Sequence, residues 1–190
     1  MQWAETYPPT VKWDADLPAK PLFEIFEDSR SRYGDRPCLD FLDRKYTYRE
    51  VGKMIDHAAA GFQALGVKKG VKVGLFLPNC PQHVVCYYGI LKAGGTVVNF
   101  SPLYAEPELL HQIEDSHTDI MVTLNLTLLY PKMLAMLGKS RLKKLVVGTM
   151  PEVLSFPKNL LFPIARSKDV AKVLDDARHV SFKELLNNDG

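Results

Sequence analysis

The sequence predicts an α/β fold in which helices cover both faces of a mostly parallel sheet, preceded by an extended arm and a short hairpin. Between residues 71 and 148, short apolar runs rich in branched side chains alternate with segments of helical periodicity. Such alternation folds into a parallel sheet with right-handed crossovers. The 190 residues, 46% apolar and 24% charged, have the composition of a folded domain with its own core.

The chain is expected to begin with an extended arm over residues 1–19, because its three prolines and the residues before them disfavour helix. From Pro21, apolar side chains recur on one stripe as far as Tyr33, which predicts a helix that Gly34 ends in a left-handed conformation. Two short strands follow, and the polar pair at residues 43–44 suits the tight turn of a hairpin between them.

The strongest helix signal begins at Thr47. Thr47 and Glu50 have the spacing of a capping box, in which the two side chains satisfy backbone amides at the start of a helix. Apolar residues from Val51 to Leu65 then recur at steps of three and one, and Gly66 closes the segment. A helix with a single apolar face is therefore predicted here.

Strands and helices alternate from this point on. We expect strands at residues 71–77, 96–100, 119–124 and 143–148, and helices from Pro81, at 106–116 and at 126–137. Pro131 kinks or restarts the last of these helices. Residues 20–150 would then form the α/β subdomain. Residues 151–190 would be a Pro-rich connection and a truncated C-terminal segment that does not return to the sheet.

Charge, cysteine and targeting signals exclude several classes of protein. The net charge of +2, from 24 basic and 22 acidic residues, lacks the basic field that nucleic-acid binding requires. The three cysteines, Cys38, Cys80 and Cys86, have no zinc or redox-pair spacing and are interpreted as reduced, packed thiols. With no signal peptide and no apolar run of membrane-spanning length, the cytoplasm is the expected location. The glycosylation sequon at Asn125 is then a chance match.

The motifs of common active sites are absent. Gly89 and Gly94 have the spacing of a phosphate loop, but Gly95 stands where that loop requires lysine, and no G-x-G-x-x-G or G-x-S-x-G is present. The five histidines form no H-E-x-x-H pattern, and Ser101 is interpreted as a turn residue. Residue chemistry alone therefore predicts an α/β domain without a complete active site or metal site.

Two surface segments have open interpretations. The basic run at residues 139–144 fits a solvated stretch better than a contact with phosphate or acidic lipid. The apolar run from Leu160 to Ile164 is either a packed loop, which the residues alone favour, or a contact with a membrane or a hydrophobic ligand.

Taken together, residues 47–122 resemble the start of an AMP-forming acyl-CoA synthetase of the adenylate-forming (ANL) superfamily. The resemblance lies in a series of short motifs that occur in the family's order and spacing: TYRE, GVKKGVKV, LPN, KAGG and VVNFSPLY. It implies the N-terminal part of that fold and a two-step reaction. A carboxylate attacks the α-phosphate of Mg-ATP to give an acyl-adenylate and pyrophosphate, and the CoA thiol then displaces AMP.

The resemblance also implies ATP, Mg²⁺ and CoA as cofactors of the parent enzyme. The family's Ser/Thr/Gly-rich phosphate loop, Mg²⁺-binding glutamate and catalytic lysine have no counterpart in these 190 residues, so no catalytic residue is assigned and the chain alone is expected to be inactive and to bind no cofactor tightly. Asn99, Phe100 and Ser101 correspond to a loop near the CoA channel in related synthetases. A plain turn before Pro102 is the alternative for these three residues.

Residues 150–186 further resemble the long connection of bacterial long-chain fatty-acid CoA ligases. This implies a medium- or long-chain fatty acid substrate and a peripheral membrane contact through Leu160 to Ile164. One alternative is a non-catalytic binding or homodimerisation module that pairs through the arm, with Trp3 and Trp13. Another is a flavodoxin-like nucleotide binder, because α/β sheets host many functions.

Overall fold

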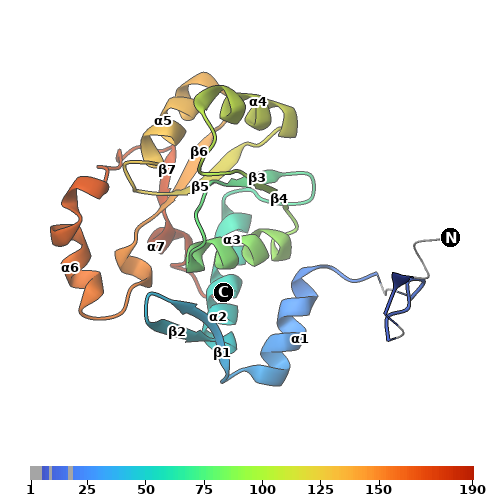
Figure 1. Cartoon of the computed structure of the whole chain (residues 1–190). Helices are drawn as coiled ribbons and strands as arrows, with labels where there is room; N and C mark the ends of the chain where they lie inside the picture. The colour runs from blue at the N-terminus through green and yellow to red at the C-terminus, as the bar shows by residue number, and fades with distance from the viewer. Residues whose placement is uncertain (1–5, 9, 17–18) are drawn as a thin grey trace.

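The computed structural model describes residues 6–8, 10–16 and 19–190, and its centre is a five-stranded parallel sheet (Figure 1). The strand order is β4-β3-β5-β6-β7. Every neighbouring pair in this sheet is parallel, which confirms the predicted fold class. The strands are β3 (Lys72–Leu75), β4 (Thr96–Asn99), β5 (Ile120–Leu124), β6 (Lys144–Gly148) and β7 (His179–Ser181).

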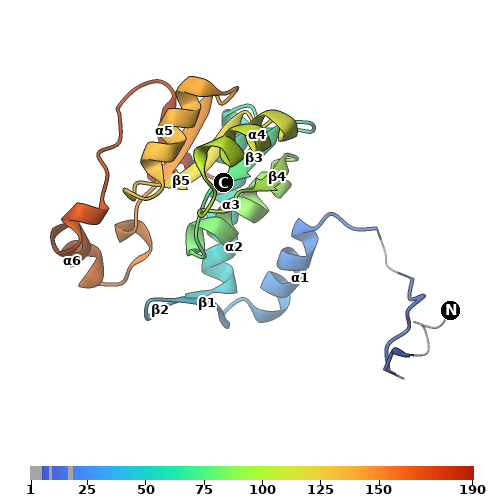
Figure 2. The same ribbon diagram turned by 45° about the horizontal axis from the view of Figure 1, so that its top comes forward.

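Helices cover both faces of the sheet. One face carries α2 (Tyr48–Ala64), α3 (Pro81–Lys92) and α7 (Phe182–Leu185), and the other carries α4 (Glu106–Ser116) and α5 (Tyr130–Lys139) (Figures 1 and 2). All five residues of the central strand β5 are buried. A parallel sheet covered on both faces requires such continuous apolar strands, which is why period-two alternation was absent from the sequence.

The start of α2 is the capping box that its sequence predicts. The Glu50 N–H donates to Thr47 Oγ1 at 3.2 Å, and the Thr47 N–H donates to Glu50 Oε2 at 2.7 Å. Gly66 follows the helix with φ +88°, in the left-handed region that favours glycine. Both ends of the predicted helix are thus confirmed.

Two turns near the N-terminus differ from expectation. Gly34, after α1 (Phe23–Tyr33), keeps a right-handed φ of −40°. Its carbonyl accepts the Arg49 N–H at 2.8 Å, so the chain turns directly into the hairpin and needs no left-handed cap. The hairpin itself is confirmed as β1 (Pro37–Phe41) and β2 (Arg44–Thr47). Its turn is one residue earlier than expected, because Leu42 and Asp43 have the positive φ values, 50° and 69°.

The structure shows what Pro131 and Gly89 do in their helices. Pro131 lies in the first turn of α5, so it starts the helix at Tyr130, and the preceding residues from Leu126 form a turn. In α3, a Cβ added at Gly89 would lie 2.8 Å from the Ala58 Cβ of α2. Gly89 therefore serves close helix packing, consistent with the rejection of a phosphate loop at this position.

The chain returns to the sheet near its C-terminus, which contradicts the expectation for residues 151–190. β7 pairs with β6 in parallel, with Val180 opposite Val146, and α7 buries Phe182 and Leu185 in the core. The segment between β6 and β7 contains α6 (Lys158–Ala165) and two short 3₁₀ turns, Pro151–Val153 and Ser167–Asp169. A three-residue strand after a charged run is too short to give a periodicity signal.

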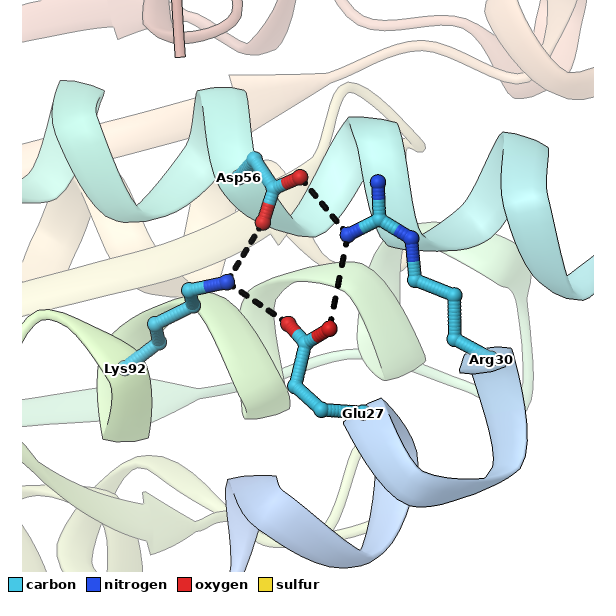
Figure 3. A network of polar contacts seen from close by, with 4 residues as sticks. All are labelled: Glu27, Arg30, Asp56 and Lys92. Atoms are coloured by element: carbon cyan, nitrogen blue, oxygen red, sulfur yellow. Dashed lines mark hydrogen bonds and ion pairs between the residues drawn. The ribbon is translucent and has the colours of Figure 1, made fainter. Parts of the chain in front are cut away.

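A ring of four charges fastens α1 to α2 and α3 (Figure 3). Arg30 Nη1 lies 2.8 Å from Asp56 Oδ2 and 3.5 Å from Glu27 Oε2. Lys92 Nζ lies 2.6 Å from both Glu27 Oε1 and Asp56 Oδ1. Every charged group in the ring thus has two neighbours of opposite charge. Each side chain is also about one-third exposed or less, so little water surrounds the ring.

The predicted arm lies only partly within the described residues, and Trp3 is outside them. Tyr7, Val11 and Trp13 are each about half exposed, and residues 10–16 lie beyond α1 in both views (Figures 1 and 2). Among the described residues, no helix combines the length and apolarity needed to cross a membrane.

Candidate functional site

The sheet has a switch in winding direction between β3 and β5. From β3 the chain passes through α3 to β4 on one side, whereas from β5 it passes through α5 to β6 on the other side. The two helices therefore leave the neighbouring strands over opposite faces (Figure 1). Open α/β sheets bind ligands at such a point, outside the carboxyl ends of the strands, so this edge is the candidate site.

Asn99, Phe100 and Ser101 lie at this edge, at the end of β4, and differ in environment. Asn99 is exposed, and its backbone carbonyl accepts the Gln112 side-chain N–H at 3.0 Å. Phe100 is 3% exposed and packs in the core. Ser101 Oγ accepts the Leu103 N–H at 3.3 Å, which confirms that Ser101 is a turn residue. A role for the three residues in CoA binding stays a prediction, and Asn99 has the most accessible side chain.

A second set of polar residues meets at the same edge where the segments after β3 and β6 come together. Gln82, in the first turn of α3, is 0% exposed, and its Nε2 donates to the Thr149 carbonyl at 3.0 Å. Glu152 Oε2 accepts the Thr149 N–H at 2.8 Å. Gln82 Oε1 and the buried Thr123 Oγ1 have no hydrogen-bond partner among the described residues.

The edge also alters the acid–base properties of its residues. Burial raises the pKa of Glu152, although the Thr149 N–H that it accepts acts in the opposite direction. Burial likewise raises the pKa of Cys80 to about 11, partly offset by the N–H groups of His83 and Gln82. Burial also raises the pKa of Cys86 well above its ordinary value. Cys80 and Cys86 are therefore poor nucleophiles, in agreement with their interpretation as reduced, packed side chains.

Few anion donors or metal ligands gather at this edge among the described residues. The first amides of α3, which would be the natural anion donors, are hydrogen-bonded to Cys80. Among the described residues, no three His, Cys, Asp or Glu side chains come together in a way that could hold a metal. The polar groups described at this edge are therefore mainly acceptor oxygens and one carboxylate.

Sequence reasoning missed Gln82 and Glu152. A signal for Gln82 was the single amide at the start of a helix that is apolar on nearly every face. Thr149 and Glu152 repeat the spacing of Thr47 and Glu50, so the second T-x-x-E pattern could have identified the Glu152 contact.

Fold and site define an open α/β protein whose candidate site lies at the carboxyl edge of a parallel sheet. The family model described as "AMP-binding enzyme" matches residues 26–184. The chain belongs to this family, which confirms the resemblance drawn from its motifs.

Two curated relatives are similar to the chain over nearly its whole length. A long-chain-fatty-acid–CoA ligase of Bacillus subtilis (strain 168) is 35% identical over 185 residues, which cover 97% of this chain and 31% of the relative. A ligase of the same name from Escherichia coli O157:H7 is 31% identical over 98% of this chain and 34% of the relative. The chain thus spans about a third of the length of the curated relatives it matches.

Solved structures share the fold. A long-chain-fatty-acid–CoA ligase from Archaeoglobus fulgidus has a TM-score of 0.63 at 20% identity, covering 88% of this chain and 35% of that structure. The luciferase-like enzyme from the mealworm Zophobas morio has a TM-score of 0.70 at 15% identity, covering 94% and 37%. At these identities the likeness shows the fold alone, and it agrees with the predicted acyl-CoA synthetase architecture.

Proposed function

We propose that this chain forms the N-terminal part of an ATP-dependent, AMP-forming fatty acid–CoA ligase. The reaction would convert a carboxylate, ATP and CoA into acyl-CoA, AMP and pyrophosphate through an acyl-adenylate. The observation that carries the proposal is the 35% identity to the Bacillus subtilis long-chain ligase over 97% of this chain. Membership of the AMP-binding family supports the use of ATP and CoA.

Within that enzyme, this part would supply the parallel sheet and one wall of the site. Asn99 to Ser101 would line the path of CoA, and the unpartnered Gln82 oxygen would accept a donor from the remaining two-thirds of the enzyme. Mg²⁺ belongs to the proposal as the ion that accompanies ATP. Its ligands would come from outside the described residues, among which no metal-binding group occurs.

Because the proposed substrate is a fatty acid, the proposal also includes a peripheral contact of the enzyme with a membrane. Long acyl chains partition into bilayers because each buried CH₂ contributes about 0.8 kcal/mol. The segment from Leu160 to Ile164 is mostly exposed, and it forms most of α6. This exposure supports the membrane alternative over the packed-loop interpretation that the residues alone favoured.

The activity proposal is tested by assaying the purified 190-residue chain with ATP, palmitate and CoA. We expect no AMP above background and no tight ATP binding by calorimetry, because the family's phosphate loop, Mg²⁺-binding glutamate and catalytic lysine have no counterpart in these 190 residues. Palmitate-dependent AMP formation by this chain, or saturable micromolar ATP binding, would contradict the placement of the catalytic groups outside it.

A second candidate function is a homodimerisation module that uses the arm. The exposure of Tyr7, Val11 and Trp13 favours it, because each presents an apolar surface at an end of the chain. Light scattering of the full chain and of a variant lacking residues 1–19 tests it. A stable dimer that dissociates on deletion supports the module, and a monomer in both cases eliminates it.

A further inference from the structure

The loop between β4 and α4, residues 100–105, has few hydrogen bonds of its own. The Leu103 N–H donates to Ser101 Oγ at 3.3 Å, and the Tyr104 N–H donates to the Ser101 carbonyl at 3.1 Å. Both bonds end at Ser101, inside the same loop. They shape the turn, but they do not attach its tip to the rest of the molecule.

Side chains of two helices make that attachment. Gln112 Nε2 of α4 donates to the Asn99 carbonyl at 3.0 Å, where the loop begins. Lys132 Nζ of α5 donates to the Tyr104 carbonyl at 2.9 Å and makes a longer contact of 3.5 Å with the Pro102 carbonyl. Because α4 and α5 pack side by side on one face of the sheet, they hold the loop at its start and at its tip (Figures 1 and 2).

The position of Lys132 is unfavourable for a lysine unless the loop is considered. It lies in the first turn of α5, where the helix dipole disfavours a cation, and this turn has no acidic side chain. Among the described residues, both hydrogen bonds of its ammonium group go to the loop carbonyls. Ordering a long side chain also costs conformational entropy. Bonds from a charged donor are stronger than bonds between neutral groups, so the loop carbonyls account for this lysine.

We propose that Lys132 is a positioning residue, which holds the loop after β4 in the conformation in which Asn99 and Ser101 contact CoA. This inference rests on the proposed function for the identity of the ligand, and it adds the group that sets the geometry of the contact. Gln112 and Lys132 bind main-chain carbonyls, so neither occupies the side chain of the exposed Asn99. A loop fixed in advance loses less conformational entropy when its ligand binds.

The first measurement of the test is amide hydrogen exchange in the 190-residue chain, followed by NMR. K132M keeps the length and apolar stem of the side chain and removes its charge. We expect the Leu103 and Tyr104 amides to exchange at least about tenfold faster, because a bond from a charged donor is lost, whereas the amides of β5 should exchange as before. K132R keeps a cationic donor and should restore most of the protection.

Lys139 provides the matched control. It lies on the same helix and pairs with Glu106 of α4 at 2.9 Å, where both side chains are about half exposed. K139M therefore removes the same charge from α5 without changing the bonds to the loop carbonyls. The Leu103 and Tyr104 amides should exchange in K139M as they do in the unmodified chain. Equal exchange rates in K132M and K139M overturn the proposal.

The second measurement separates positioning from a purely structural role. It uses a chimera in which these 190 residues replace the aligned segment of the Bacillus subtilis ligase. K132M should raise KM for CoA about tenfold and change KM for ATP by no more than about twofold, and K132R should lie closer to the unmodified chimera. Equal changes in the two constants, or an unchanged KM for CoA, overturn the proposal.

Failure of the proposed ligase function has a different signature. A folded but inactive chimera would contradict that function. The exchange rates of K132M and K139M in the 190-residue chain involve no substrate, so they decide in either case whether Lys132 holds the loop.

Discussion

At the scale of single residues, the four charges that join α1 to the two neighbouring helices show how environment sets protonation. Burial raises the pKa of Asp56, but the hydrogen bonds and positive charges of Lys92 and Arg30 outweigh that effect and hold the pKa below its ordinary value. Lys92 shows the corresponding effect for a basic group. Burial lowers its pKa, but the hydrogen bonds to Asp56 and Glu27 outweigh burial and hold the pKa above its ordinary value. The folded state therefore favours the charged form of both side chains.

The depressed pKa of Asp56 predicts a pH-dependent part of the stability. Its contribution is fully present above the unfolded pKa of about 4 and is lost as pH falls through the lower folded value. D56N should lower the free energy of unfolding by about 1 to 3 kcal/mol at neutral pH, because two charged donors lose an ionised acceptor. Urea unfolding at neutral pH and at about pH 3 should show that D56N loses less stability on acidification than the unmodified chain does.

Asp28 provides the matched control for that experiment. It lies on α1, whereas Asp56 lies on α2, and it pairs with Lys20 where both side chains are about half exposed. D28N should change stability by no more than about 0.5 kcal/mol at either pH, since surface pairs contribute little. If D56N and D28N gave parallel pH profiles, the ring would not account for the acid sensitivity.

At the scale of elements, close helix packing depends on glycines that the fold cannot replace. A Cβ added at Gly61 of α2 would lie 2.1 Å from the Leu185 carbonyl oxygen of α7, whereas one added at Gly138 of α5 would meet nothing within 4 Å. The carbonyl belongs to the backbone and cannot turn away. Both glycines lie in helices, but only Gly138 has room for a side chain.

Alanine at these two positions should have opposite effects. G61A should lower the free energy of unfolding by about 1 to 3 kcal/mol, because α2 and α7 must separate. G138A should raise it by up to about 1 kcal/mol through helix propensity. Chemical denaturation of both variants measures the difference, and a stabilised G61A would show that α7 does not pack on α2 as described.

Local signals account for the elements that the sequence predicted well. The capping box of Thr47 and Glu50 depends only on residues three positions apart, and the alternation from residue 71 to 148 is set by apolar spacing. The hairpin turn lies at Leu42 and Asp43, between the paired residues Phe41 and Arg44, and Lys158, far along the chain, binds the Leu42 carbonyl and the Asp43 carboxylate there. Such distant contacts leave no trace in a local pattern.

At the scale of the whole molecule, the difference between local signals and distant contacts also explains which parts of the site the sequence could predict. The sheet edge with Asn99 was predictable, because consecutive strand ends share one edge of a parallel sheet. The meeting of Gln82 with Thr149 was not, because it joins residues 67 positions apart. The addition of β7 beside β6 likewise depends on a pairing between distant segments, which three residues cannot signal.

Polar residues of distant segments meet at the carboxyl edge of the sheet. Gln82 Oε1 has no hydrogen-bond partner among the described residues, and burial raises the pKa of Glu152, which contacts the same residue, Thr149. Buried acceptors of this kind are normally satisfied. Under the proposed function, the phosphate-binding groups would lie in the part of a longer ligase that this chain does not span.

The most direct measurement of that central claim is the activity of a chimera. The segment of the Bacillus subtilis ligase that aligns with this chain would be replaced by these 190 residues, with the aligned Escherichia coli segment grafted in the same way as a control. We predict palmitate-dependent AMP release by a folded chimera and none by this chain alone. A folded chimera that forms no AMP, beside an active control graft, would contradict the account.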